Sequence, residues 1–237
     1  MMADSSVSKP FNQRIILCKV LESLTTPQWH AETVCKGWNA SHIAAHLIVR
    51  ERNPFAALGI VFPAFSGFHT RGVAKVSTYP RAWLINRLYD GPPWWTRVGQ
   101  IHIGEDWIHT QDIVRGHATD ADPNHELEID SGTHPPALYT GLVRACDRFA
   151  PLAFRTLAGP FRIHLTDGEG FERTWMVRPG TRSAVLANMT NVAPDVTITG
   201  AVGELLLTLT GREHVATVTY TGNPDHIATI RNGISGI

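Results

Sequence analysis

Two side chains able to bind a metal ion stand four residues apart in the middle of this chain. Glu105 and His109 would project from the same side of a helix. A carboxylate and an imidazole placed in this way can both reach one divalent ion at about 2 Å and leave coordination positions open. A third ligand must come from elsewhere, and His46 is the best candidate because the alanines before it permit close helix approach. The spacing therefore predicts a metal site between two helices.

The segment around Glu105 carries a polar stripe along one side of the expected helix, whereas Trp107 and other apolar residues lie opposite. The stripe consists of His102, Glu105, His109 and Asp112. It is typical of a solvated helix face, but it would also fit a polar face turned into a helical bundle. Inside a bundle, Asp112 could hydrogen-bond a liganding imidazole and fix its tautomer, and Asp106 could pair with His109.

The third ligand has alternatives. A single histidine in an apolar helix is often a core residue with no ligand role, and this applies to His46. His42 stands one helical turn earlier and could replace or support it. Arg50 follows one turn later and either lines the site or belongs to a charged helix end.

Composition narrows the function classes. The 237 residues, 43% of them hydrophobic, suffice for one large domain or two modest ones. The 21 basic and 21 acidic residues leave a formal charge of zero, which argues against nucleic acid and membrane partners. Three separated cysteines without a CxxC pair disfavour a disulfide framework and a thiolate zinc site. With no signal-like segment and no long apolar run, we expect a cytoplasmic protein. None of the three cysteines falls in the segments of His46 and Glu105, so we assign no nucleophile of the protein itself.

Helical periodicity dominates the first two thirds of the chain. It predicts helices over residues 11–24, from Asn39 to before Pro54, and over 80–89, 99–115 and 137–149. Residues 53–77 are rich in glycine, proline and phenylalanine, which indicates a buried connection without regular structure.

In the last third of the chain, apolar and polar residues alternate as in β-strands. Residues 161–166 and 171–177 flank Asp167–Gly170 as a hairpin, and 195–199 and 215–220 are further strands. Helices are expected at 201–209 and from Pro224 onward. The sequence thus predicts an α+β protein, with a helical bundle over residues 1–155 and a small α+β domain over 156–237.

Two motifs in the helical part resemble a known family. Residues 38–47, Trp-Asn-Ala-Ser-His-Ile-Ala-Ala-His-Leu, resemble the first signature of the mycothiol-dependent maleylpyruvate isomerase family, the actinobacterial branch of the DinB-like four-helix proteins. Residues 105–109, Glu-Asp-Trp-Ile-His, resemble its second signature. The resemblance implies that His46, Glu105 and His109 are the protein ligands of one divalent ion, for which zinc is the first expectation.

The resemblance extends along most of the chain. Residues 195–200 and 203–212 are similar to the family's C-terminal domain, so a sterol-carrier-like α+β unit is expected after a DinB-like four-helix bundle. Arg212 would correspond to an arginine that grips a substrate carboxylate, although a helix-end arginine facing solvent is the simpler interpretation. Residues 49–59 and 91–95 resemble, more narrowly, a subfamily of actinobacterial metal-binding proteins.

The resemblance also implies an activity. In the isomerase a metal-bound thiol of mycothiol adds to a double bond, permits rotation and leaves. We therefore expect a divalent-metal protein that acts as a thiol-dependent isomerase or transferase, with a small electrophile and a low-molecular-weight thiol such as mycothiol as partners. Two alternatives are a metal-dependent hydrolase and a non-catalytic binding module for an apolar ligand with a structural metal. Substrate, native metal and oligomeric state stay open.

Overall fold

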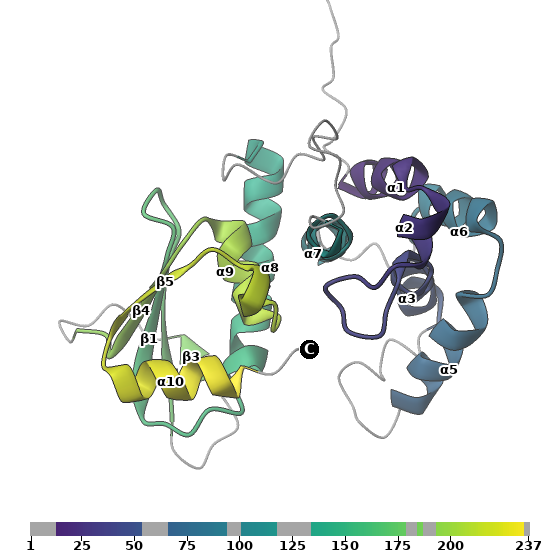
Figure 1. The fold of residues 1–237 in the computed structure, drawn as a ribbon. Coiled ribbons are helices and arrows are strands. Elements are labelled where there is room, and N and C mark those ends of the chain that lie inside the picture. Colours follow the sequence, from purple (N-terminus) through teal and green to yellow (C-terminus); the bar gives the residue numbers. More distant parts are fainter. Residues whose placement is uncertain are drawn as a thin grey trace, which may run out of the picture.

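The computed structural model of the protein describes residues 13–53, 66–93, 101–117, 134–178, 184–186 and 193–234. Its elements form a helical group and a mixed group of helices and strands, with one helix between them (Figure 1). Trp94 and Trp95, which end one of the family-like segments, lie outside the described residues.

Five helices of the described residues open the helical group. They are α1 (Gln13–Ser23), α2 (Thr26–His30), α3 (Ala40–Arg52), α5 (Ser66–Val76) and α6 (Arg81–Tyr89). The start of α3 is fixed by Asn39, whose side chain accepts a hydrogen bond from the His42 backbone N–H, as the sequence predicts. Helices α1, α3 and α6 share one apolar core with part of α7 (Ile101–Gly116).

The first predicted helix ends at Ser23, close to its predicted end at residue 24, and a short helix that was not predicted, α2, follows with Pro27 in its first turn, where a proline is tolerated. One part of the sequence prediction is wrong in this region. Residues 66–76 form helix α5 although a connection without regular structure was expected. The glycine content has a packing reason, because a Cβ atom at Gly72 would lie 2.8 Å from Cγ1 of Val49 on α3.

In the part of the chain that the structure describes, the mixed group contains three helices, a short 3-10 turn and a sheet. The elements are α8 (Pro136–Phe154), β1 (Phe161–Thr166), β2 (Glu172–Val177), β3 (Ala184–Leu186), β4 (Val196–Thr199), α9 (Val202–Leu209), η3 (Glu213–Val215), β5 (Thr219–Gly222) and α10 (Pro224–Gly233). Strand order is β3-β2-β1-β4-β5. β1 pairs antiparallel with β2 and parallel with β4.

The strand predictions hold for the hairpin and for β4. Strand β5 starts later than predicted because η3 occupies residues 213–215, and β3 has no counterpart in the prediction. Helix α8 continues through Pro151, which the sequence suggested as its end. Together with the described helices, this sheet confirms the α+β class.

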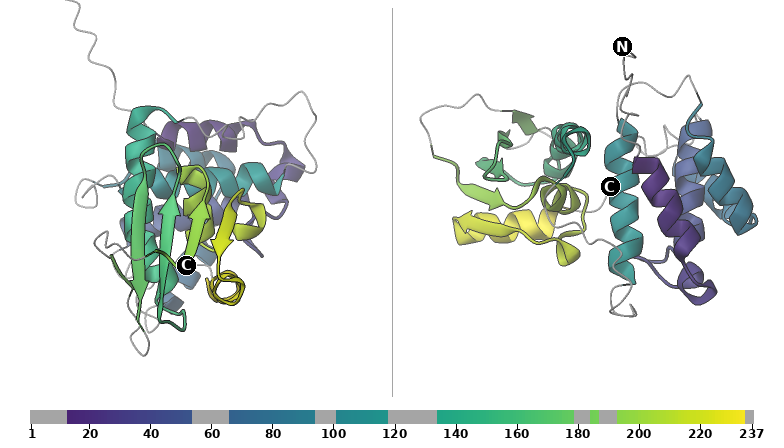
Figure 2. Two further views of the ribbon diagram at one scale, coloured as in Figure 1. Left: turned by 90° about the vertical axis from the view of Figure 1, so that its left-hand side faces the viewer. Right: turned by 90° about the horizontal axis from the view of Figure 1, so that it is seen from above.

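Helix α7 belongs to both cores. Its Trp107 and Ile108 are buried with α8, α9 and the sheet, whereas Ile113 and Val114 are buried with α1, α3 and α6. Figure 1 and the right-hand view of Figure 2 show α7 between the two groups, with α8 and α9 between α7 and the sheet. On its remaining side, Glu105 and His109 of the polar stripe face α3.

Helix α8 shares the core of the C-terminal sheet and packs along α9. A boundary between residues 155 and 156, which assigns α8 to the N-terminal unit, stays a prediction. None of the described helices is long and apolar enough to cross a membrane.

Candidate metal centre

Asp112 is the buried anion of the site. Its Oδ2 lies 2.9 Å from Nδ1 of His109, and both carboxylate oxygens accept hydrogen bonds from Arg212, at 2.8 and 2.9 Å. Burial alone would raise the pKa of Asp112, but the hydrogen bonds from His109 and Arg212 hold it below its usual range. A carboxylate accepts hydrogen bonds only, so the proton of His109 resides on Nδ1 and the Nε2 lone pair is available to an ion. The expected hydrogen bond between Asp112 and His109 is present, and the role of Asp112 beside a liganding imidazole stays a prediction.

His46 on α3 faces His109 on α7. The two ring centroids are 4.9 Å apart, and the ring of Trp38 lies 5.3 Å from that of His46. Burial lowers the pKa of both histidines, and for His46 the proximity of His109 and Arg50 adds to the effect. Both rings are therefore neutral at neutral pH, which is the form that binds metals. The polar stripe of α7 lies inside the protein, as the less common of the two interpretations requires.

Glu105 lies on the same side of α7 but is engaged by Arg50. The two form an ion pair in which both side chains are largely buried. Arg50 also contacts Nδ1 of His102, at 3.2 Å. Glu105 would have to share its charge between Arg50 and an ion, and the set His46, Glu105 and His109 stays a prediction.

The other sequence candidates have different partners. His42 has its Nδ1 2.7 Å from Oδ1 of Asn39 and stacks on Trp38, so it belongs to the cap of α3. His102 lies beside Glu51, with a distance of 3.5 Å between Nδ1 and Oε1. The proposed pairing of Asp106 with His109 is wrong, because Asp106 binds Arg14 at 2.6 Å.

Arg212 does not face solvent, so the simpler interpretation of this residue is wrong. Its side chain is 11% exposed and donates two hydrogen bonds to Asp112. Nη1 donates to the carbonyl of Thr210 at 2.6 Å, and Nη2 also lies 3.1 Å from the sulfur of Cys35. The C-terminal unit thus reaches the centre through one guanidinium group.

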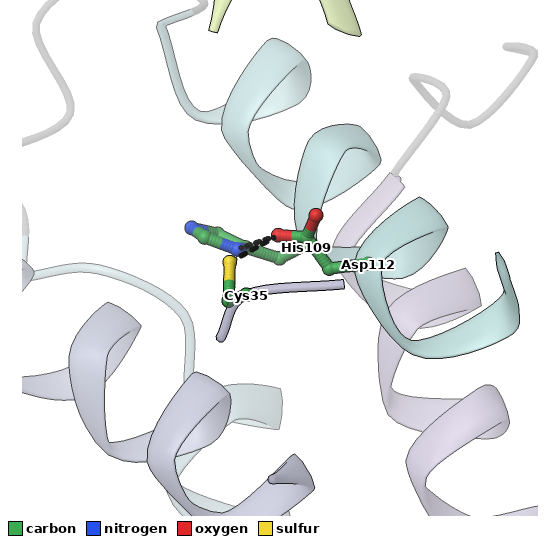
Figure 3. A group of neighbouring side chains, drawn as sticks. All are labelled: Cys35, His109 and Asp112. Atoms are coloured by element: carbon green, nitrogen blue, oxygen red, sulfur yellow. Dashed lines mark hydrogen bonds and ion pairs between the residues drawn. The ribbon is translucent and has the colours of Figure 1, made fainter. Parts of the chain in front are cut away.

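Cys35 is a site residue that sequence reasoning missed (Figure 3). Its Sγ lies 3.1 Å from Oδ2 of Asp112, and the donor atoms of Cys35, His109 and Asp112 all lie within 4.8 Å of one another. The loop that carries Cys35 is held to α7 by a hydrogen bond from Val34 N–H to the Asp112 carbonyl, 3.0 Å long. It packs closely, since a Cβ atom at Gly116 would lie 2.8 Å from Cα of Thr33. Cys35 belongs to no sequence pattern typical of metal ligands. The one sequence feature that could have pointed to it is its position three residues before the first family-like motif.

An ion could therefore lie on either of two sides of His109, next to Nδ1 or next to Nε2. On the Nδ1 face, Arg212 already places a cation against both Asp112 and Cys35. Burial and the nearby Asp112 raise the pKa of Cys35 to about 12, so the thiol is protonated. An ion there would have to displace a guanidinium and remove a proton. The described hydrogen bonds of His46 and His109 are made through Nδ1, so the Nε2 side of His109, which is turned towards α3, is favoured for an ion.

Comparison with known proteins supports the architecture. No protein-family model matches the chain, and no curated protein matches it. A crystal structure of the mycothiol-dependent maleylpyruvate isomerase matches with a TM-score of 0.51 and 15% identity over 88% of each chain. A histidine-to-alanine mutant of this isomerase matches with a TM-score of 0.52, at the same identity and coverage. The protein has the fold of this isomerase, in agreement with the family that its two motifs resemble.

Proposed function

We propose that this protein binds one divalent metal ion through His46, Glu105 and His109. The observation that carries the proposal is the meeting of two neutral imidazoles from α3 and α7, whose described hydrogen bonds are made through Nδ1, that of His46 with His69 and that of His109 with Asp112. Glu105 stands one turn before His109 on the same side of α7 and supplies the carboxylate. Nitrogen and oxygen ligands with open positions suit zinc, which is the first metal to test.

The function that fits this centre best is a thiol-dependent isomerase or transferase acting on a small electrophile. A bound divalent ion favours the thiolate form of a thiol placed at its open position. The chain itself offers no thiolate, because Cys35 is protonated and Cys18 and Cys146 are buried. The sulfur must then come from a cosubstrate, and mycothiol is the candidate because the isomerase of the same fold depends on it.

Arg212 is the candidate for holding a substrate carboxylate. Four of its five N–H groups are directed to Asp112, Cys35 and Thr210. One N–H on Nη1 remains for a ligand among the described contacts. Arg212 therefore offers a substrate one hydrogen bond, and a bidentate grip would require that Asp112 be released.

Metal analysis of single-site variants tests the ligand set. We expect about one equivalent of divalent metal in the purified protein. Alanine at His46, Glu105 or His109 removes a ligand and should abolish or strongly weaken binding. The matched control is His42→Ala, which makes the same change one turn away on α3 and should retain the metal. Equal loss in His42→Ala and His46→Ala, with both proteins folded by circular dichroism, would make the assignment wrong.

The activity is tested with mycothiol and a panel of small electrophiles. Mass spectrometry should show conversion or adduct formation with the metal-loaded protein and none after chelation. Turnover without any thiol would identify a hydrolase instead. Saturable uptake of a fluorescent lipid, unchanged by chelation and without turnover, would identify a binding module with a structural metal.

A further inference from the structure

His69, a residue outside both family-like motifs, lies against the candidate ligand His46. Its Nε2 is 2.9 Å from Nδ1 of His46, and the ring centroids are 4.9 Å apart with the planes nearly perpendicular. His69 belongs to α5 and is half-buried. No other described hydrogen bond reaches Nδ1 of His46.

The helix that carries His69 is brought close to α3 by a glycine. Gly72 stands three residues after His69, so the two lie on the same side of α5. A Cβ atom at Gly72 would lie 2.8 Å from Cγ1 of Val49, so any larger residue would push α5 away from α3. The close packing of these helices therefore sets the distance between the two histidines.

The hydrogen bond between two neutral imidazoles has two forms. If His46 donates its Nδ1–H to Nε2 of His69, then Nε2 of His46 carries a lone pair and can bind an ion. If His69 donates from Nε2, then His46 carries its proton on Nε2 and cannot bind an ion there. The protonated nitrogen in this one hydrogen bond thus decides whether His46 is a ligand.

The two candidate histidine ligands differ in this respect. The partner of His109 is the carboxylate of Asp112, which accepts hydrogen bonds only. The partner of His46 is a neutral ring that can either accept or donate. We propose that His69 is a positioning residue that accepts from Nδ1–H of His46 and so directs Nε2 of His46 to the metal. This inference rests on the proposed metal centre.

Nitrogen NMR of the histidine rings in the metal-free, full-length protein tests the tautomer directly. We expect the His46 proton on Nδ1 in the wild type. In His69→Phe, which keeps a ring but has no acceptor, this preference should be lost. In His69→Gln, whose side-chain oxygen accepts a hydrogen bond, it should be largely restored. A proton on Nε2 of His46 in the metal-free wild-type protein would overturn the proposal, even if the same protein binds metal in a titration.

Metal titration of the same variants supplies the second measurement. Loss of a partner that orients a metal ligand typically weakens binding about 10- to 100-fold. We expect a loss of this size in His69→Phe and recovery of most of it in His69→Gln. Unchanged affinity in His69→Phe, with binding abolished in His46→Ala, would overturn the role of His69 and leave the metal centre intact. Abolished binding in both His69 variants would make His69 a ligand instead and would equally overturn it.

Discussion

At the residue scale, Asp112 connects the parts of the centre. Its two oxygens accept hydrogen bonds from Nδ1 of His109, from two N–H groups of Arg212 and from the thiol of Cys35. Three separate segments of the chain therefore meet at one carboxylate. Since Arg212 balances its charge, Asp112 can remain an anion while buried at 1% exposure.

A substitution at Cys35 separates the two possible positions of the ion. We expect Cys35→Ala to bind metal with unchanged stoichiometry and affinity, because Arg212 and His109 still hold Asp112 in place. The measurement is a metal titration beside that of His46→Ala. Should Cys35→Ala lose the ion while His46→Ala keeps it, the ion belongs to the group of Cys35, His109 and Asp112.

At the scale of the elements, α7 packs against α8 through glycines. A Cβ atom at Gly104 would lie 2.5 Å from Cβ of Ala145, and one at Gly141 would lie 2.6 Å from Cγ2 of Ile103. These contacts bring the two helices close together next to Glu105. A glycine in a helix interior is unfavourable by about 1 kcal/mol relative to alanine, so packing outweighs helix propensity here.

We predict that Gly104→Ala destabilises the protein by roughly 1–3 kcal/mol, although alanine is the better helix former. Denaturant unfolding gives the change in free energy. The control is Gly67→Ala on α5, where no atom of the described residues lies within 4 Å of the added Cβ and no destabilisation is expected. Greater stability of Gly104→Ala would show that α7 and α8 can separate without cost.

The sequence predicts much of the fold because the deciding signals are local. Apolar spacing and the Asn39 cap locate α3, and alternation around Asp167–Gly170 locates the β1–β2 hairpin. Helix α5 escapes prediction because its glycines disfavour a helix locally, while contact with α3 requires one of them. Tertiary packing overrides local preference at that point.

The centre is predictable only in part, for a related reason. His109 and Asp112 share one helix, so their spacing reveals their hydrogen bond. Cys35 lies on a loop and His69 on α5, and the local sequence around each does not predict its contact with the centre. The position of Arg50 one turn after His46 makes it a candidate site residue, but the spacing does not predict the ion pair that it forms with Glu105 on another helix.

At the scale of the whole molecule, buried ion pairs join segments that are distant in sequence. Arg212 from the C-terminal unit binds Asp112 on α7, and Arg115 on α7 binds Glu204 on α9. The Arg14 side chain on α1 binds both Glu51 on α3 and Asp106 on α7. Removal of one member of a buried pair leaves an uncompensated charge, which costs about 3–5 kcal/mol.

Glu51 makes this stability dependent on pH. Although burial opposes ionisation, hydrogen bonds from His102 and Arg14 lower its pKa from 4.5 to about 2. A carboxyl group with a lowered pKa stabilises the fold above its unfolded pKa, and this contribution is lost as the pH falls from 4.5 towards 2. We predict that Glu51→Gln is less stable than the wild type at pH 7 and that the difference shrinks by pH 3.

Unfolding free energies of both proteins at pH 7, 4.5 and 3 test this dependence. The control is Asp147→Asn, which breaks a pair with Arg173 in which both side chains are about one-third exposed. It should change stability by less than about 1 kcal/mol. A difference between Glu51→Gln and the wild type that stays constant from pH 7 to pH 3 would contradict the prediction.

The membership of α7 in both apolar cores has a consequence for the motions of the protein. Trp107 and Ile108 are held by one core and Ile113 and Val114 by the other, so the amides of α7 become accessible to solvent only when both cores open. Hydrogen exchange of this helix should then follow the global free energy of unfolding rather than a local fluctuation. We therefore expect Glu105 and His109 to lie on one of the slowest-exchanging helices of the protein, and their spacing to be kept when less stable segments open locally.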